Sequence, residues 1–137
     1  MRLVVLDTNV IVSAGINRDG FPARIVRAAI QEASIQIAVC PAIVTEYRQV
    51  SRYSKFAQYD FPPEWLEFLI EGALRFPDPE SWPHPLPDPE DACFLSLAYK
   101  TGAWLITGNL KHYPIKSREG VIVRTPAEYA ASLDEMP

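Results

Sequence analysis

Residues 3–7 read Leu-Val-Val-Leu-Asp, four apolar side chains followed by a carboxylate. A short β-branched apolar run of this kind predicts a strand buried on both faces, as in a parallel sheet. Further strands are expected at Ile35–Val39, Trp104–Thr107 and Val121–Val123. Helical patterns separate the first three of these strands, a loop separates the last two, and long hairpin signals are lacking. We therefore expect an α/β fold, a three-layer α/β/α sandwich with a central, mostly parallel sheet.

Helices are expected where apolar residues recur at helical spacing. The segment Gly15–Gly20 is loop-like, and proline stands in the first turn of several expected helices. Gly102 marks the end of one, and Thr125-Pro-Ala-Glu128 has the form of a capping box at the start of the last. The expected helices are Pro22–Ala33, Pro41–Arg52, 62–76, Pro89–Thr101 and one that follows Thr125.

Two segments of the middle of the chain need separate interpretation. The expected helix 62–76 is apolar around most of its circumference, more than a surface helix requires, so it is either well buried or a dimer or partner surface. Residues 77–89 hold six prolines in thirteen positions. This composition predicts an extended connector that crosses the sheet, with a polyproline ligand for a partner as the alternative.

Length and composition are those of one domain, residues 1–137, with 48% hydrophobic residues to form a core. The net charge of −4 argues against a simple cationic nucleic-acid binder, but residues 60–91 carry nine acids and one base. The rest of the chain is mildly basic, which permits nucleic acid as a partner. Cys40 and Cys93 are expected to be reduced core thiols. No stretch approaches the ~20 apolar residues that span a bilayer, and we expect a cytoplasmic protein.

Several acidic residues occupy positions where a binding site is expected. Asp7 ends the first strand, and ligands of open parallel sheets bind beyond the carboxyl ends of the strands. Asn109 follows a later strand in the same way. Glu46 shares the apolar face of its helix, where a boundary role is the alternative. Asp88 and Asp91 begin another helix, where both can act as caps, although Asp91 points inward.

Clustered carboxylates raise one another's pKa unless a cation neutralises them. Oxygen ligands without an accompanying Cys–His set favour Mg²⁺ or Mn²⁺, which can activate water and stabilise charge on a phosphodiester. The two histidines, His84 and His112, are expected at the surface, with contact to phosphate as the alternative for His112. Ser13 and Ser96 lack a partner histidine for nucleophilic catalysis, and no phosphate-binding glycine loop is present.

The pattern as a whole resembles the PIN-domain family, from Arg2 to about Tyr129. The resemblance rests on Asp7-Thr-Asn9 after a strand, the helical Glu46, Asp88-Pro-Glu-Asp91-Ala-Cys-Phe-Leu-Ser-Leu-Ala98 and Thr107-Gly-Asn109. It is similar in particular to the VapC-type toxins of toxin–antitoxin pairs.

This resemblance implies a parallel-sheet PIN fold, a metal-dependent ribonuclease, an antitoxin partner and often a homodimer. It assigns metal binding to Asp7, Glu46 and Asp91, and treats Asp88 as a frequent extra acid. Polar residues that line the site correspond to Asn9 and Thr107. Asn109 stands where many relatives have aspartate, which leaves the number of metal ions open.

The leading hypothesis is therefore an endoribonuclease that uses Mg²⁺ or Mn²⁺, with Asn109 and Thr107 orienting water or phosphate. A non-cleaving PIN-like module that binds protein or RNA is the second interpretation. A phosphohydrolase of the haloacid-dehalogenase type is disfavoured, because that chemistry needs a second acid where this chain has Asn9.

Overall fold

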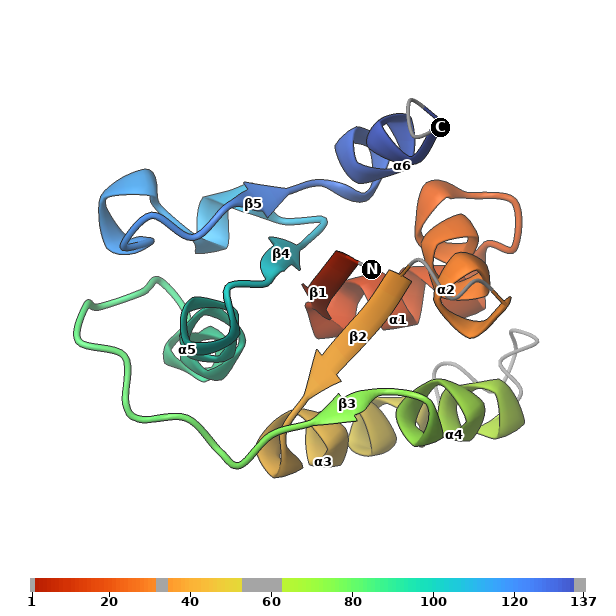
Figure 1. Ribbon diagram of the computed structural model, residues 1–137, viewed down its shortest axis with the longest axis horizontal. Coiled ribbons are helices and arrows are strands. Elements are labelled where there is room, and N and C mark those ends of the chain that lie inside the picture. The colour runs from red at the N-terminus through yellow and green to blue at the C-terminus, as the bar shows by residue number, and fades with distance from the viewer. Residues whose placement is uncertain (1, 32–34, 53–62, 135–137) are drawn as a thin grey trace.

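The computed structural model describes residues 2–31, 35–52 and 63–134. Its centre is one sheet of five strands in the order β3-β2-β1-β4-β5, and every neighbouring pair is parallel (Figure 1). The expected α/β fold with a parallel sheet is confirmed. The strands are β1 Arg2–Leu6, β2 Ile35–Val39, β3 Leu74–Arg75, β4 Trp104–Ile106 and β5 Val123–Arg124.

The central strand β1 explains why the first apolar run decides the fold. It pairs with β2 and β4, and its residues Val4, Val5 and Leu6 have no solvent exposure. Pairing continues one residue beyond the strand, where the Asp7 amide donates to the Ile106 carbonyl over 2.9 Å. The residues that follow β1 and β4 therefore lie side by side at the carboxyl edge of the sheet.

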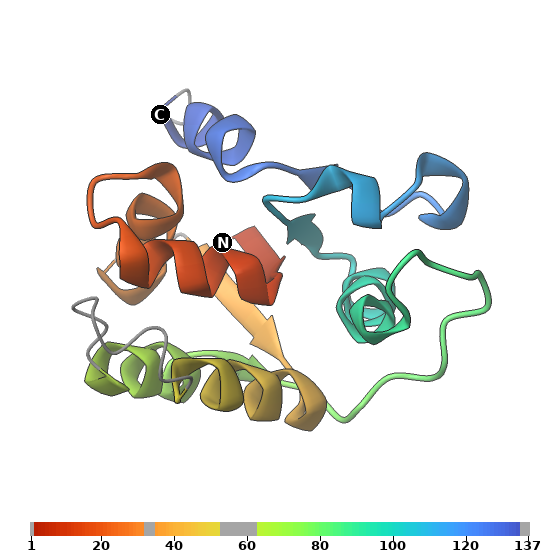
Figure 2. The same ribbon diagram turned by 180° about the vertical axis from the view of Figure 1, so that it is seen from behind.

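Helices flank the sheet and complete the expected three layers. Helix α5 packs against β1, β2 and β4, whereas α1 packs against α2 and α3. In the view from behind, α1 and α3 lie in front of the strands (Figure 2). The helices are α1 Thr8–Ile16, α2 Phe21–Gln31, α3 Pro41–Ser51, α4 Pro63–Glu71, α5 Ala92–Thr101 and α6 Pro126–Asp134, with 3₁₀ turns η2 Pro89–Asp91, η3 Leu110–His112 and η4 Ile115–Ser117.

Several expected boundaries are wrong, and α1 was not expected. Its β-branched residues have weak helix propensity, and packing against α2 and α3 outweighs this. The helix expected at 62–76 ends at Glu71, and the short strand β3 follows. The last strand begins two residues later and ends one residue later than expected, and the helix expected from Pro89 begins as the 3₁₀ turn η2. The expected end of α2 at Ala33 lies outside the described residues.

Helix α4 is mainly a core element, as the first of the two interpretations predicted. Leu66, Leu69 and Ile70 are buried, whereas Phe68 is 66% exposed. Beside Phe68, α4 carries the exposed acidic residues Glu64, Glu67 and Glu71.

The proline-rich connector forms neither helix nor strand between β3 and η2 (Figure 1), as expected. Trp82 fixes it: its Nε1 donates to the Ser117 carbonyl over 2.8 Å, and its ring meets Tyr99 edge-on at 5.5 Å. The Ser96 hydroxyl donates to the Glu80 carbonyl over 2.6 Å. The connector is thereby attached to α5 and to η4 before it reaches Asp88.

Both cysteines are free thiols, as expected. Burial raises the pKa of Cys40 to about 11 and that of Cys93 to about 12, so neither is a reactive thiolate at neutral pH. No helix within the described ranges is long and apolar enough to cross a membrane.

Candidate functional site

Asp7 lies at the carboxyl end of β1, in the N-cap position of α1. Its carboxylate makes no cap hydrogen bond, so the capping alternative is wrong. Instead Asp7 Oδ2 accepts from the Thr107 hydroxyl over 2.9 Å and from the Tyr113 hydroxyl over 2.8 Å. The residue is 4% exposed, and Oδ1 has no hydrogen-bond partner among the described residues. The protein thus holds one carboxylate oxygen and leaves the other available.

Thr107 connects the segment that follows β4 with Asp7 and Asn9, which follow β1. It has no solvent exposure, and its hydroxyl accepts from Asn9 Nδ2 (3.2 Å) and from the Asn109 amide (3.0 Å). Asn9 Oδ1 in turn accepts from the Gly108 amide over 2.8 Å. These bonds fix the orientation of Asp7. Substrate contact by Asn9 and Thr107 stays a prediction.

Tyr113 is a site residue that sequence reasoning missed. Burial and the charge of Asp7 raise its pKa far above the usual value, so the phenol keeps its proton and donates to the carboxylate. The only signal in the sequence is an aromatic residue four positions after Asn109.

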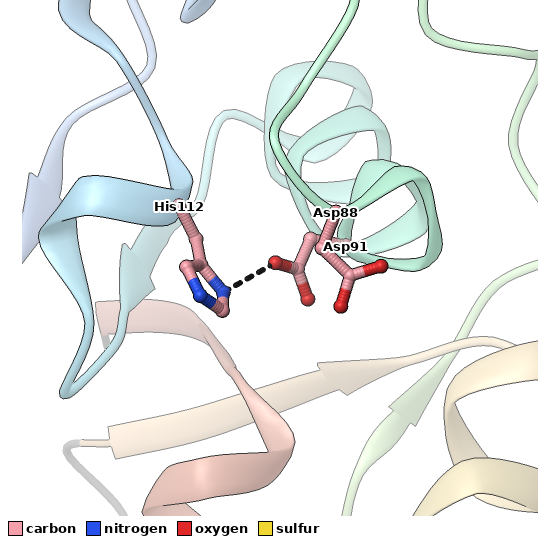
Figure 3. A group of neighbouring side chains, drawn as sticks. All are labelled: Asp88, Asp91 and His112. Carbon is pink, nitrogen blue, oxygen red and sulfur yellow. Dashed lines mark hydrogen bonds and ion pairs between the residues drawn. The ribbon is translucent and has the colours of Figure 1, made fainter.

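Asp91, His112 and Asn109 form a second hydrogen-bonded group, of which Figure 3 shows Asp91 and His112. Asp91 Oδ2 lies 2.8 Å from His112 Nδ1, and His112 Nε2 lies 2.8 Å from Asn109 Nδ2. Because an amide nitrogen only donates, this arrangement assigns the imidazole proton to Nδ1, which donates to Asp91. The side chain of His112 is 37% exposed, in line with the expected surface position, and it also bridges two predicted site residues, Asp91 and Asn109.

Asp88 and Asp91 differ in their local roles. Asp88 Oδ1 accepts from the Glu90 amide over 3.0 Å and caps η2, as its position before Pro89 predicts. Asp91 is 7% exposed and makes no cap hydrogen bond. Its carboxylate is directed to His112 instead.

One group of potential metal ligands emerges within the described ranges. Asp88, Asp91 and His112 each offer one donor atom, and these atoms all lie within 4.8 Å of one another (Figure 3). Asp7 and Glu46 lie outside this group. The geometry therefore brings Asp88 and Asp91 together with a histidine that the sequence did not place among the ligands.

Asp7 and Glu46 still interact electrostatically with Asp91 of the ligand group. Burial, Asp7 and Asp88 raise the pKa of Asp91 to about 6, and His112 opposes this shift. Burial also raises the pKa of Glu46, with contributions from Asp7 and Asp91. The four predicted acids thus share one electrostatic environment.

The donor set fits a divalent cation. Carboxylates with one imidazole are ligands that Mn²⁺ and related ions accept, and no described lysine or arginine forms an ion pair with these acids. The Thr8 hydroxyl, 6% exposed, lies near enough to Glu46 to lower its pKa in part. It nevertheless makes no hydrogen bond of normal geometry with a described residue. A buried, unsatisfied hydroxyl beside excess negative charge is consistent with a cation or its water ligands.

Comparisons with known proteins agree with this architecture. Two similar solved structures are VapBC2 from Rickettsia felis bound to a DNA fragment from their promoter, and PAE2754 from Pyrobaculum aerophilum. The first has 17% identity and a TM-score of 0.62, covering 90% of this chain and 98% of that chain. The second has 13% identity and a TM-score of 0.59, covering 98% and 91%. At such identities the likeness shows the fold alone. No curated protein matches the chain.

The family assignment comes from the sequence. A family model described as PIN domain matches residues 3–111, a range that includes Asp7, Glu46, Asp88, Asp91 and Asn109. The match covers well over half of the chain, and the chain therefore belongs to the PIN-domain family.

Proposed function

We propose that this protein is an endoribonuclease that depends on Mg²⁺ or Mn²⁺ and hydrolyses phosphodiester bonds. The observation that carries the proposal is the shared environment of Asp7, Glu46, Asp88 and Asp91 at the carboxyl edge of the sheet. No described lysine or arginine is ion-paired with these acids, so a bound cation would offset their repulsion.

Each acid has a role in this proposal. Asp7, Glu46 and Asp91 hold the ion and Asp88 assists them. When bound there, the ion supplies positive charge to the phosphate and lowers the pKa of a water ligand. Thr107 and Tyr113 fix Asp7 through Oδ2, and Oδ1 has no hydrogen-bond partner among the described residues. Such a fixed carboxylate loses little entropy when it binds.

RNA is the proposed substrate, with phosphate contacts close to the acids. Asn109 and His112 lie at the edge of the site and are partly exposed, as is Asn9. Lys111 and Lys116 are exposed on the turns η3 and η4 and make no ion pair within the described ranges. Lysines of this kind neutralise backbone phosphates and make binding dependent on salt.

Cleavage of RNA by purified protein with Mn²⁺ tests the proposal. The wild type is expected to cut, and Asp7→Asn to lose at least about a hundredfold in rate, since it removes a charge directed at the metal. Lys100→Ala, a change on the exposed end of α5, is a control purified in the same way. Equal cleavage by wild type and Asp7→Asn would show contamination and end the assignment.

A toxin role with an antitoxin partner is proposed as the cellular context, in the cytoplasm where RNA is accessible. It is supported by the sequence resemblance to VapC-type toxins and by the fold shared with the VapBC2 complex. A cavity of about 240 Å³ between α1, α2 and α4 has a largely apolar lining that includes Val26, Ile30 and Trp65. An apolar segment of an antitoxin would fit such a surface.

Expression in a bacterial host tests this role separately from the chemistry. Induction is expected to arrest growth, and co-expression of a small neighbouring gene is expected to restore it. Growth unaffected by an active enzyme would remove the toxin role and leave the nuclease.

We also propose a homodimer. The resemblance to VapC-type toxins implies one, and Phe68 on α4 is 66% exposed, which leaves an apolar side chain for a contact between two copies. Light scattering at micromolar concentration is expected to give the dimer mass, and Phe68→Asp to reduce it. A monomeric mass for the wild type contradicts the proposal.

A non-cleaving PIN-like binding module is the second candidate, because Asn109 brings no charge to the site and is bonded to His112. Isothermal titration separates the two functions. If the wild type does not bind Mn²⁺ at millimolar concentration, the binding module is favoured. If the wild type binds Mn²⁺ and Asp7→Asn loses that binding, the enzyme is favoured.

A further inference from the structure

We infer that His112 adds a nitrogen ligand to the divalent ion proposed above, on the side of Asp88 and Asp91, and that Asn109 orients its ring. This makes the site selective for a first-row transition ion such as Mn²⁺ over Mg²⁺. The inference rests on the proposed metal-dependent function, but it concerns binding and is tested without RNA cleavage.

The first argument is the separation of the donor atoms. Those of Asp88, Asp91 and His112 lie within 4.8 Å of one another, close enough to surround one ion. His112 Nδ1 and Asp91 Oδ2 are 2.8 Å apart. Two neighbouring ligands of an octahedral ion with bonds of about 2.1 Å are themselves about 3 Å apart. The hydrogen bond therefore already has the spacing of two adjacent ligands.

The second argument is the amide of Asn109. For Nδ1 to bind an ion, the ring must carry its proton on Nε2, which then needs an acceptor. Asn109 lies 2.8 Å from Nε2 and supplies that acceptor when its amide turns to present Oδ1. The proton moves between the ring nitrogens through solvent and the imidazole stays neutral. An amide serves both tautomers, since it can donate and accept.

The third argument is the rigidity of the supporting segments. His112 ends the turn η3, where its amide donates to the Asn109 carbonyl over 3.1 Å. The next residue, Tyr113, is bonded to Asp7, and the Asn109 amide is bonded to Thr107. The ring is thus held by the same network that orients Asp7. A histidine free to move would not be kept at this distance from Asp91.

The nitrogen ligand gives the expected selectivity. Mg²⁺ binds oxygen ligands and retains water, whereas imidazole suits transition ions. Removal of His112 is therefore expected to weaken the binding of Mn²⁺ far more than that of Mg²⁺. A residue that merely supports the fold would change both affinities equally.

Calorimetric titration with MnCl₂ and with MgCl₂ tests the selectivity. His112→Ala is expected to lose at least about tenfold in Mn²⁺ affinity and less than about threefold in Mg²⁺ affinity, and Asn109→Ala about tenfold for Mn²⁺. His84→Ala is the matched control, because His84 contacts Glu119 and is absent from the ligand group. Its Mn²⁺ affinity is expected to equal that of the wild type.

Pulsed electron paramagnetic resonance of bound Mn²⁺ gives a direct readout that needs no variant. Coupling to ¹⁴N of an imidazole is expected in the wild type and in His84→Ala, and is expected to vanish in His112→Ala. Bound Mn²⁺ without ¹⁴N coupling in the wild type, or equal losses for both metals in His112→Ala, overturns the inference. Absence of RNA cleavage with this coupling present would remove the proposed nuclease and leave the ligand assignment intact.

Discussion

The Thr107 hydroxyl donates to Asp7 Oδ2 over 2.9 Å although the two residues are one hundred positions apart in the chain. Each follows one of two neighbouring parallel strands, β1 and β4. The bond therefore depends on correct pairing of the sheet, and it fixes the carboxylate that the proposed chemistry needs most.

Replacement of Thr107 by valine keeps the shape and removes the hydroxyl. Asn9 Nδ2 and the Asn109 amide lose their acceptor, so we expect a loss of about 1–3 kcal/mol in the free energy of unfolding. Mn²⁺ affinity is expected to fall as well, because Asp7 loses one of two hydrogen bonds. Urea unfolding measures the free energy of unfolding, and calorimetric titration measures the Mn²⁺ affinity. Thr107→Ser keeps the hydroxyl and is expected to retain the affinity; equal loss in both variants contradicts this role.

Gly108→Ala is expected to disturb the site through Asn9. An added Cβ would lie 3.1 Å from Asn9 Oδ1, the atom that accepts from the Gly108 amide. We expect a destabilisation of about 1 kcal/mol from this overpacking, with lower Mn²⁺ affinity. Gly72→Ala is the control, since its nearest atom is the Phe68 carbonyl oxygen at 3.6 Å. Gly72→Ala is expected to be neutral or slightly stabilising in thermal unfolding. A Gly108→Ala variant more stable than Gly72→Ala would contradict the structure.

Trp82 is expected to determine how firmly the connector is held. Trp82→Ala removes both the hydrogen bond to the Ser117 carbonyl and the ring contact with Tyr99. Amide hydrogen exchange over residues 77–91 should become faster, and Mn²⁺ affinity should fall a fewfold because Asp88 and Asp91 end this segment. Trp82→Phe keeps the ring contact and should show a smaller effect. Unchanged exchange in Trp82→Ala would mean that other contacts hold the connector.

The capping box of α6 gives a prediction about stability and pH. The Thr125 amide donates to Glu128 Oε1 over 2.9 Å, and the Glu128 amide donates to Thr125 Oγ1 over 3.2 Å. Thr125→Ala is expected to cost about 1 kcal/mol in urea unfolding at pH 7. The bonds with Thr125 lower the pKa of Glu128, so this stabilisation is present above the pKa of the unfolded chain and is lost as the pH falls through the folded value.

Glu128→Gln removes the negative charge of Glu128 and keeps a side-chain oxygen, so it isolates the contribution of the charge to the free energy of unfolding. The difference in stability between wild type and Glu128→Gln is expected to be largest near pH 7 and to shrink below about pH 4, where glutamate protonates. A difference that grows on acidification would contradict the assignment.

The parallel sheet could be predicted from the sequence because its central strands β1, β2 and β4 are largely buried and appear as short apolar runs. Ile35–Val39 appears in the structure with the expected bounds. Helix α1 could not be predicted in the same way, since its β-branched residues favour strands locally and only packing decides otherwise. Strand β3 has two residues, too few for any periodic pattern.

The site was predictable only in part for a related reason. Asp7 and Asp91 could be proposed because strand ends and helix starts are visible in the sequence. The contacts of His112 and Tyr113 depend on how the turn η3 folds back over Asp91 and Asp7, which no local pattern encodes. Distances between side chains from separate loops follow from tertiary packing alone.

The order of the strands has a consequence for biosynthesis. Among the strands of the sheet β1 is synthesised before the others and occupies the middle, yet the groups that hold Asp7 come from residues 107 and 113. A ribosome-bound chain shorter than this has no complete site, since such distant contacts form late. The proposed nuclease would therefore gain its fixed Asp7 only after residues 107 and 113 have left the ribosome.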